Sequence, residues 1–269
     1  MATIDGSAVR RYRQGSHVYV AELRRPRVKN AFDDAMYQQL MAALDEFEAA
    51  DELHALVITG HGDYFTSGAD IEQAMGRLGD GESQLPSKGE PKKFMHRLLD
   101  CKKLVVAAVN GPAIGIGVTL LMHCDLVFAA DRATFWTPFM RLGIVPEYGS
   151  SYMFPHVLGR LAANDLLMRS KQIDANRALA IGLVGDVLPT DGFLGRVLTE
   201  IEPLVNDPHT ARNLPAYKKI NRRVQDPLVR EAIVAEYEEL DRRFLAGETQ
   251  RAAVALFQQL RPKNKSSRL

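Results

Sequence analysis

The chain has 269 residues, of which 46% are apolar and 25% charged, so it can bury a large core as a globular protein. Its 34 Lys and Arg against 33 Asp and Glu leave a net charge of +1, which gives no general attraction to nucleic acid or to a membrane surface. No apolar run reaches the roughly 18 residues of a membrane-spanning helix, and the N-terminal residues lack the apolar core of a signal peptide. Cys101 and Cys124 come shortly after apolar stretches and indicate buried, reduced thiols, so we expect a reducing compartment.

The first 50 residues predict a β-hairpin, a basic loop and a helix. Residues 9–13 and 17–23 flank a Gln-Gly-Ser turn and are typical of paired strands. Residues 24–30 contain three Arg, one Lys and a proline; they suit contact with phosphates, although a solvated loop is the simpler interpretation of the spacing alone. A helix beginning at Asp33 and Asp34 has a predicted buried stripe of Met36, Leu40, Leu44 and Phe47.

Two later stretches share one order: a short apolar strand, a turn with glycine, and the start of a helix. The first comprises a strand at residues 55–59 and a turn at 65–71; the second comprises a strand at 104–109, a turn at 110–117 and a helix at 118–122. Two such units can bring two helix N-termini together, where free backbone N–H groups suit an oxygen that becomes anionic during a reaction. Taken singly, each stretch is better interpreted as an ordinary strand-to-helix turn.

The rest of the chain predicts an α/β core followed by helices. Residues 74–91, rich in Gly, Ser, Pro and charge, predict a mobile loop beside a pocket, and a helix resumes over residues 91–101. Strands are expected at residues 125–129 and 184–188. Further helices are expected at residues 161–168, 175–181, 192–205, 227–246 and 250–260.

Several kinds of site find no support in the sequence. The seven histidines are scattered, and no spacing of Cys, His and Asp is typical of a metal site, so no metal is predicted. Gly115 and Gly117 lack the third glycine of a dinucleotide fingerprint, and no glycine loop ends in Gly-Lys-Ser/Thr. The residues around Ser150 do not match the Gly-x-Ser-x-Gly nucleophile elbow.

Glu147 is the candidate general base. It stands alone between an apolar segment and a turn of small residues, with Phe135, Trp136 and Phe139 upstream. Such surroundings desolvate a carboxylate and raise its pKa toward the range useful for a base. The alternative is a surface glutamate in a turn or an acid at a helix N-terminus.

Three motifs resemble the crotonase, or enoyl-CoA hydratase/isomerase, superfamily: residues 65–71, residues 109–117 and the basic loop at 25–31. Residues 131–139 and 146–155 further resemble the Δ3-Δ2-enoyl-CoA isomerases of the peroxisomal type. The resemblance implies an α/β fold, a crotonase-like spiral of ββα repeats with a helical C-terminal trimerisation region. The corresponding expected domains are an acyl-CoA-binding core over residues 1–199 and an oligomerisation region over residues 200–269, in a homotrimer or a dimer of trimers.

The same resemblance implies a binding site for an acyl-CoA thioester. Its oxyanion hole would consist of the backbone N–H groups of Ala69 and Ile116; most relatives have glycine at the second position, but the hole needs only the backbone. Coenzyme A is part of the substrate, and no separate cofactor is expected. Its expected contacts are Arg27, Val28, Gly68, Asp70, Ile71 and Gly115, with Phe257 and Lys263 contributed by a neighbouring subunit's C-terminal helix.

The catalytic acids distinguish the reactions of this superfamily. Hydratases use two glutamates to add water, but this chain has Thr119 and Phe139 at those positions. The isomerases use a single glutamate, at the place of Glu147, and the resemblance therefore implies a Δ3-Δ2-enoyl-CoA isomerase of fatty-acid β-oxidation. The alternatives are a 2-enoyl-CoA hydratase or another crotonase-type acyl-CoA reaction, and a non-catalytic acyl-CoA-binding protein.

The expected localisation is cytoplasmic, without nucleic-acid or membrane partners. Ser267, Arg268 and Leu269 at the C-terminus resemble a peroxisomal signal of the Ser-Lys-Leu type, which makes the peroxisomal matrix the alternative.

Overall fold

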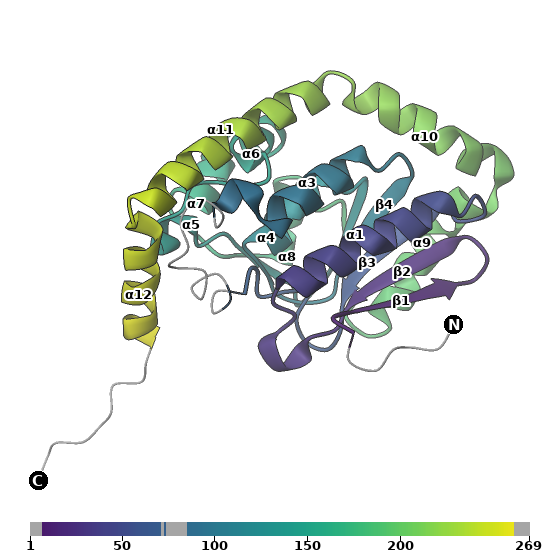
Figure 1. Cartoon of the computed structure of the whole chain (residues 1–269). Helices are drawn as coiled ribbons and strands as arrows, with labels where there is room; N and C mark the ends of the chain where they lie inside the picture. Colours follow the sequence, from purple (N-terminus) through teal and green to yellow (C-terminus); the bar gives the residue numbers. More distant parts are fainter. Residues whose placement is uncertain (1–6, 71–72, 74–84, 261–269) are drawn as a thin grey trace, which may run out of the picture.

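A six-stranded sheet forms the centre of the molecule (Figure 1). The computed structural model describes residues 7–70, 73 and 85–260. The first two strands of the sheet pair antiparallel as the predicted hairpin, and every later pair in it is parallel. The strands lie in the order β1 (Val9–Gln14), β2 (Val18–Leu23), β3 (Ala55–Gly60), β4 (Leu104–Val109), β6 (Leu126–Ala130) and β9 (Asp186–Leu188).

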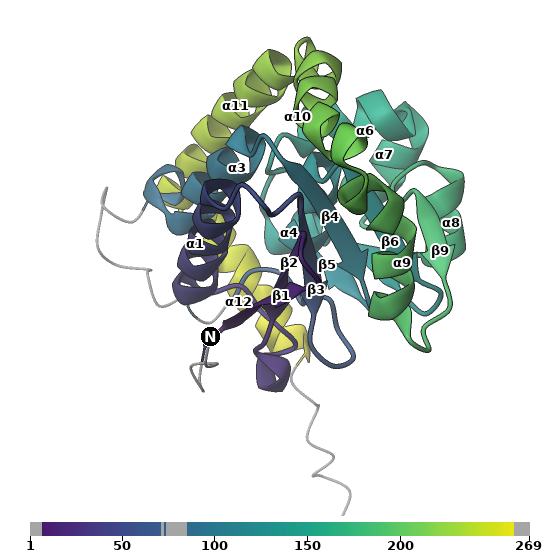
Figure 2. The same cartoon turned by 90° about the vertical axis from the view of Figure 1, so that its right-hand side faces the viewer.

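Helices cover both faces of this sheet (Figure 2). α1 (Asp34–Ala49) and α3 (Glu90–Asp100) contribute to the core on one face, and α9 (Phe193–Asn206) to the core on the other. Strand β4 alternates between them: Val105 belongs to the first core and Val106 to the second. Because both faces are buried, the strand is an unbroken apolar run.

A small second sheet of three strands lies beside the main one. Between its strands run short helices, several of which carry residues of the predicted site. These elements are β5 (Ala113–Ile114), α4 (Ile116–Thr119), η4 (Leu120–His123), β7 (Thr134–Trp136), α5 (Phe139–Leu142), α6 (Ser150–Leu158), α7 (Arg160–Leu167), β8 (Ile173–Asp174) and α8 (Ala175–Ala180).

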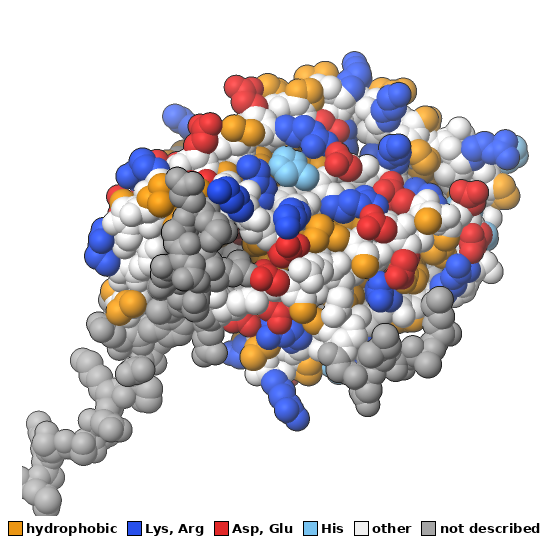
Figure 3. Space-filling view, in the orientation of Figure 1, with side chains coloured by type: hydrophobic (Ala, Val, Ile, Leu, Met, Phe, Trp, Pro, Cys, Tyr) orange, Lys and Arg blue, Asp and Glu red, His pale blue; other side chains and the backbone are white. Residues whose placement is uncertain are grey.

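The C-terminal part consists of three helices that arch over the edge of the molecule in Figure 1: α10 (Pro208–Arg222), α11 (Gln225–Leu245) and α12 (Glu248–Leu260). α11 packs against α6 and α12. Among the described helices none is long and apolar enough to cross a membrane. On the face in Figure 3, basic and acidic side chains are interspersed, in keeping with the net charge of +1.

The structure differs from the predicted elements in a few places. The helix expected at residues 118–122 begins earlier, at Ile116, because Gly115 provides the turn, and it tightens into a 3-10 turn at Leu120. α10 and α6 were not predicted, since each contains a proline, Pro215 and Pro155, that interrupts the helical pattern. Of the expected mobile loop, residues 74–84 lie outside the described residues. The domain boundary at residue 199 lies inside α9 and stays a prediction.

Candidate active site

The first predicted N–H donor, Ala69, lies beside Phe32. The N–H of Phe32 donates to the Gly68 carbonyl (2.8 Å), and the N–H of Asp70 donates to the Phe32 carbonyl (2.9 Å). In a trans peptide the C=O and N–H point in opposite directions. The N–H of Ala69 shares its peptide with the Gly68 carbonyl and therefore points away from Phe32.

The second predicted donor, Ile116, is the first residue of α4. The carbonyl of Gly115 accepts from the N–H groups of Val118 (2.9 Å) and Thr119 (3.2 Å). The N–H of Ile116 shares that peptide and points the other way, out of the helix. Within residues 7–70, 73 and 85–260, the N–H groups of Ala69 and Ile116 have no hydrogen-bond acceptor.

Two glycines bring these peptides together. Gly68 and Gly115 both have positive φ, +89° and +57°, a conformation that glycine adopts without strain. A Cβ on Gly68 would lie 2.8 Å from the carbonyl oxygen of Ile114 and 3.8 Å from the Cα of Gly115. The turn at 65–70 and the start of α4 are thus in contact, and each contributes one unpaired N–H.

Asn30 fixes the basic loop to the first of these turns. Asn30 is buried with φ +57°, and its side-chain amide donates to the carbonyls of His61 (2.9 Å) and Tyr64 (2.8 Å). Its Oδ1 accepts from the N–H of Arg25 (2.9 Å). Asparagine tolerates the left-handed region better than most residues, which explains its use here.

Arg25 adds an electrostatic link between the same two segments. Its guanidinium pairs with Asp33 and Asp70, each at 3.1 Å. Arg27 and Val28, the predicted coenzyme A contacts, are exposed next to it. A pocket of about 490 Å3 at this loop is lined by side chains that include Arg25, Arg27 and Asp33. The side chain of Asp70 also accepts from the N–H of Gln73 (3.2 Å).

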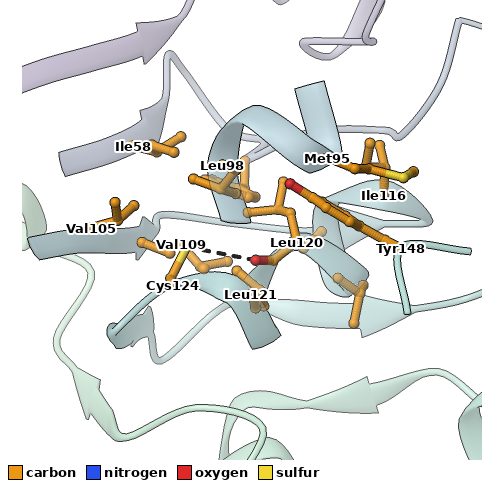
Figure 4. Close-up of a cluster of buried hydrophobic side chains, with 14 of the residues drawn as sticks. Ile58, Met95, Leu98, Val105, Val109, Ile116, Leu120, Leu121, Cys124 and Tyr148 are labelled. Carbon is orange, nitrogen blue, oxygen red and sulfur yellow. Dashed lines mark hydrogen bonds between the residues drawn. The ribbon is translucent and has the colours of Figure 1, made fainter. Parts of the chain in front are cut away.

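Glu147 lies half-buried on the turn that leads into α6. Burial raises the pKa of its carboxyl to about 7, and the negative charge of Glu236 contributes to the same direction. The next residue, Tyr148, is fully buried in the same core cluster as Ile116 and Leu120 (Figure 4). Glu147 therefore comes after the strand β4 and the helix α4, which carries Ile116. It lies at the edge of the apolar core that contains both Ile116 and Tyr148.

The peptide between Tyr148 and Gly149 is held from two sides. Its carbonyl accepts from Nε2 of His123 (2.6 Å), which carries the hydrogen because a carbonyl only accepts. Its N–H donates to the carboxylate of Glu236 (2.7 Å), whose other oxygen accepts from the N–H of Ser151 (2.8 Å). Burial lowers the pKa of His123 to about 4, so the ring is neutral near pH 7.

Thr119 and Phe139, which the resemblance places at the positions of the two hydratase acids, are both buried, and neither has an acidic side chain. Thr119 lies in α4, and its hydroxyl donates to the carbonyl of Ile116 (3.4 Å). Phe139 is the first residue of α5 and belongs to the apolar core. Glu147 is therefore left without either partner that hydration chemistry would require in this superfamily.

The structure does not describe the side chains of three predicted coenzyme A contacts. Ile71 and Lys263 lie outside the described residues, as do Ser267, Arg268 and Leu269. Phe257 lies in α12, but its side chain is not described.

Glu236 and His123 were not predicted from the sequence. A signal for Glu236 exists: it falls on the stripe of α11 that also carries Ile233 and Leu240, where an acid is out of place. No comparable pattern marks His123.

A sequence profile described as "Enoyl-CoA hydratase/isomerase" matches residues 13–262. The mouse (Mus musculus) protein "Enoyl-CoA delta isomerase 3, peroxisomal" is 40% identical over 179 residues, which cover 66% of this chain and 56% of that protein. The human (Homo sapiens) "Enoyl-CoA delta isomerase 2" is 35% identical over 232 residues, covering 86% of this chain and 58% of that protein. The chain thus spans somewhat more than half the length of these two relatives.

Solved structures confirm the predicted fold class. A crystal structure of enoyl-CoA hydratase/isomerase from Pseudoalteromonas atlantica T6c superimposes with a TM-score of 0.85 at 29% identity, covering 95% of this chain and 98% of that one. The α/β core with a C-terminal helical region is therefore the crotonase fold. With the profile match over nearly the whole chain, this shows that the chain belongs to the enoyl-CoA hydratase/isomerase family.

Proposed function

We propose that the protein is a Δ3-Δ2-enoyl-CoA isomerase, which moves the double bond of a 3-enoyl-CoA to the 2-position in fatty-acid β-oxidation. The observation that carries the proposal is Glu147, a carboxyl group whose pKa of about 7 suits a general base, with Thr119 and Phe139 at the two hydratase positions. A 1,3-proton shift needs one base that reaches both carbons, whereas hydration needs a second group to handle water.

In the proposed reaction the thioester oxygen lies between the N–H groups of Ala69 and Ile116. Glu147 takes a proton from C2, and the electron pair of that C–H bond forms the C1–C2 double bond of a dienolate, whose charge resides on the thioester oxygen. Donors placed in this way each stabilise such a charge by roughly 3–4 kcal/mol. Glu147 then returns the proton at C4, and the atoms balance without water, metal or a separate cofactor.

Coenzyme A would lie along Arg27 and Val28 and the turn at Gly68, where the basic loop and its pocket offer positive charge to phosphates. The contacts of Asp70, Ile71 and Gly115 with it are part of the proposal, as are those of Phe257 and Lys263 from a neighbouring subunit. Assembly as a homotrimer or a dimer of trimers is proposed with them.

A panel of three thioesters tests the reaction: a 3-enoyl-CoA, a 2-enoyl-CoA and a saturated acyl-CoA. We expect conversion of the first to the 2-enoyl product, slow or no hydration of the second, and binding of the third without turnover. Hydration of the 2-enoyl-CoA much faster than isomerisation would favour a hydratase. Binding of all three without any turnover would favour a non-catalytic acyl-CoA-binding protein.

The compartment is proposed as cytoplasmic, with the peroxisomal matrix as the alternative. A fluorescent reporter that ends in residues 260–269 distinguishes the two in eukaryotic cells. Diffuse fluorescence supports the cytoplasm, and punctate fluorescence that needs Leu269 supports the peroxisome.

A further inference from the structure

Glu236 is a buried carboxylate that the proposed reaction does not use. It lies on α11, is 5% exposed, and has no cation among its hydrogen-bond partners in the part of the chain that the structure describes. A buried carboxylate is costly unless hydrogen bonds compensate it. Here both oxygens are used: one accepts from the N–H of Gly149 and the other from the N–H of Ser151.

These bonds hold a backbone that would otherwise be unfavourable. Tyr148 and Gly149 both have positive φ, +64° and +69°, and for tyrosine this conformation is strained. The bond from Gly149 to Glu236 and the bond from His123 to the Tyr148 carbonyl fix the two ends of one peptide. That peptide is one residue from Glu147, so it sets where the carboxyl of Glu147 can reach.

The contact between α11 and this turn leaves little space for adjustment. A Cβ on Gly149 would lie 2.9 Å from a methyl carbon of Val229, which is also on α11. The turn is therefore pressed against the helix that carries Glu236, and its position depends on that helix.

We propose that Glu236 is a positioning residue for Glu147: it holds the Tyr148–Gly149 peptide and places a second carboxylate beside the base. The proposal rests on the function proposed above, but it concerns how the C-terminal helix α11 controls the proton carrier. It predicts two separable effects, one from the reach of the Glu236 side chain and one from its charge.

The charge effect has a definite sign wherever Glu236 is ionised, because its negative charge raises the pKa of Glu147 in addition to burial. Burial also raises the pKa of Glu236 itself, and the hydrogen bonds from Ser151 and Gly149 act in the opposite direction. The other titratable groups around this turn are Cys124, Tyr148 and Tyr237, whose pKa values are raised by burial, and His123, whose pKa is lowered. They are neutral near pH 7 and do not supply the same field. Further titratable groups near this turn among the described residues are Tyr37 of α1, Asp241 of α11, Lys92 of α3, whose Nζ lies 5.0 Å from the ring centre of Tyr237, and Arg222, whose guanidinium bonds to the carbonyl of His123.

Two variants of the whole protein separate the effects. Glu236→Gln keeps the length and one acceptor but removes the charge, so the acid limb of the kcat/KM–pH profile should move to lower pH. Glu236→Asp keeps the charge but cannot reach both N–H groups, so kcat should fall, by up to about 100-fold for a displaced base, with the acid limb unmoved. Glu238→Gln, which removes an exposed charge from the same helix, should change neither.

A stability measurement tests the same pair without relying on turnover. At a pH well above 7, Glu147→Gln should raise the melting temperature more in the wild-type background than in the Glu236→Gln background; near pH 5 this difference should vanish. A wild type that fails to isomerise 3-enoyl-CoA refutes the proposed function and leaves this measurement standing.

The proposal is overturned by an unmoved acid limb in Glu236→Gln, by an equal shift in Glu238→Gln, or by equal melting-temperature gains in both backgrounds. If Glu236→Gln does not fold, Glu236→Asp decides alone, and a wild-type kcat in that variant refutes the positioning role.

Discussion

Gly68 and Gly115 meet backbone to backbone, each with positive φ, and the following residue of each carries one of the two unpaired N–H groups. This contact places two turns that lie far apart in the sequence at one point. A side chain is therefore unfavourable at either position. At Gly68 both the positive φ and the lack of space oppose it, and at Gly115 the positive φ does.

Gly68→Ala should reduce both activity and stability. The added Cβ meets the Ile114 carbonyl oxygen at 2.8 Å, and the positive φ costs about 1–2 kcal/mol for any L-residue with a side chain. The turn must shift, so the donor of Ala69 moves and kcat should fall more than acyl-CoA affinity. Steady-state kinetics and urea unfolding measure the two effects.

Gly62→Ala is the matched control for this change. Its φ is +77°, but a Cβ there meets nothing within 4 Å. It should lose a similar amount of conformational stability and keep wild-type kcat. Equal kcat values in the two variants would contradict a role of the Gly68 contact in placing the donor.

Asn30→Asp should destabilise the protein by about 3 kcal/mol without changing its shape. The substitution replaces a donor with an acceptor that faces the carbonyls of His61 and Tyr64 in a buried position. Urea unfolding at neutral pH measures the loss. Asn221→Asp makes the same chemical change at an exposed position of α10 and should leave the unfolding free energy within about 0.5 kcal/mol of wild type. An unchanged midpoint in Asn30→Asp would show that Asn30 does not hold the loop.

The pH dependence of stability provides a test of the environment of Glu147. Because its folded-state pKa is raised to about 7 from 4.5, its contribution to stability is full below pH 4.5 and is lost as the pH rises through about 7. The shift corresponds to about 3 kcal/mol at most, and partial exposure of the side chain makes the contribution smaller than this.

Glu147→Gln has no such titration. Its stability relative to wild type should therefore increase from about pH 5 to about pH 8, by the amount above. Urea unfolding at these two pH values measures the difference, and Glu238→Gln should show no comparable change. A constant difference between Glu147→Gln and wild type would mean that the pKa of Glu147 is not raised.

Assembly can be tested at α10. Tyr217 and Ile220 on α10, and Val224 just before α11, are 68%, 58% and 62% exposed, which is unusual for a group of large apolar side chains unless another subunit covers them. We expect light scattering to report a trimer or hexamer, and Ile220→Glu to shift it toward monomer. Lys219→Glu, the adjacent exposed position, should not. A wild-type monomer at micromolar concentration would contradict the proposed assembly.

The sequence predicted the elements whose pattern is contained in a short stretch of chain, and it predicted other elements less well. Strand β4 was predicted with its ends because both of its faces are buried, and this leaves an apolar run that can be read directly. The buried stripe of α1 was predicted for the same reason: its period is contained in one helix. By contrast α10, with Pro215 inside a mostly polar helix, gives no clear period.

The candidate site shows the same division. Glu147 could be found from its neighbours and from the resemblance to the isomerases. Glu236 is marked only as an acid on the buried stripe of α11, and its role could not be found, because the hydrogen bond that gives it that role joins residues 87 positions apart. No pattern in α11 says which turn its buried acid will contact.

Glu147→Gln is the decisive substitution for the proposed reaction. Glutamine keeps the size and much of the hydrogen bonding of the side chain but cannot accept a proton from C2. Loss of a general base typically costs about 10²–10⁴ in rate, so kcat for isomerisation of 3-enoyl-CoA should fall by that order. Acyl-CoA affinity should change much less, because the proposed oxyanion donors are the backbone N–H groups of Ala69 and Ile116.

Rapid-mixing assays of isomerisation, with binding of a saturated acyl-CoA measured separately, distinguish the two effects. If Glu147→Gln isomerises near the wild-type rate, another residue carries the proton. If Glu147→Gln binds no acyl-CoA, the substitution has disturbed the site as a whole. Glu147→Asp, which keeps the carboxyl group on a shorter side chain, is then the deciding variant, and a return of activity in it supports Glu147 as the base.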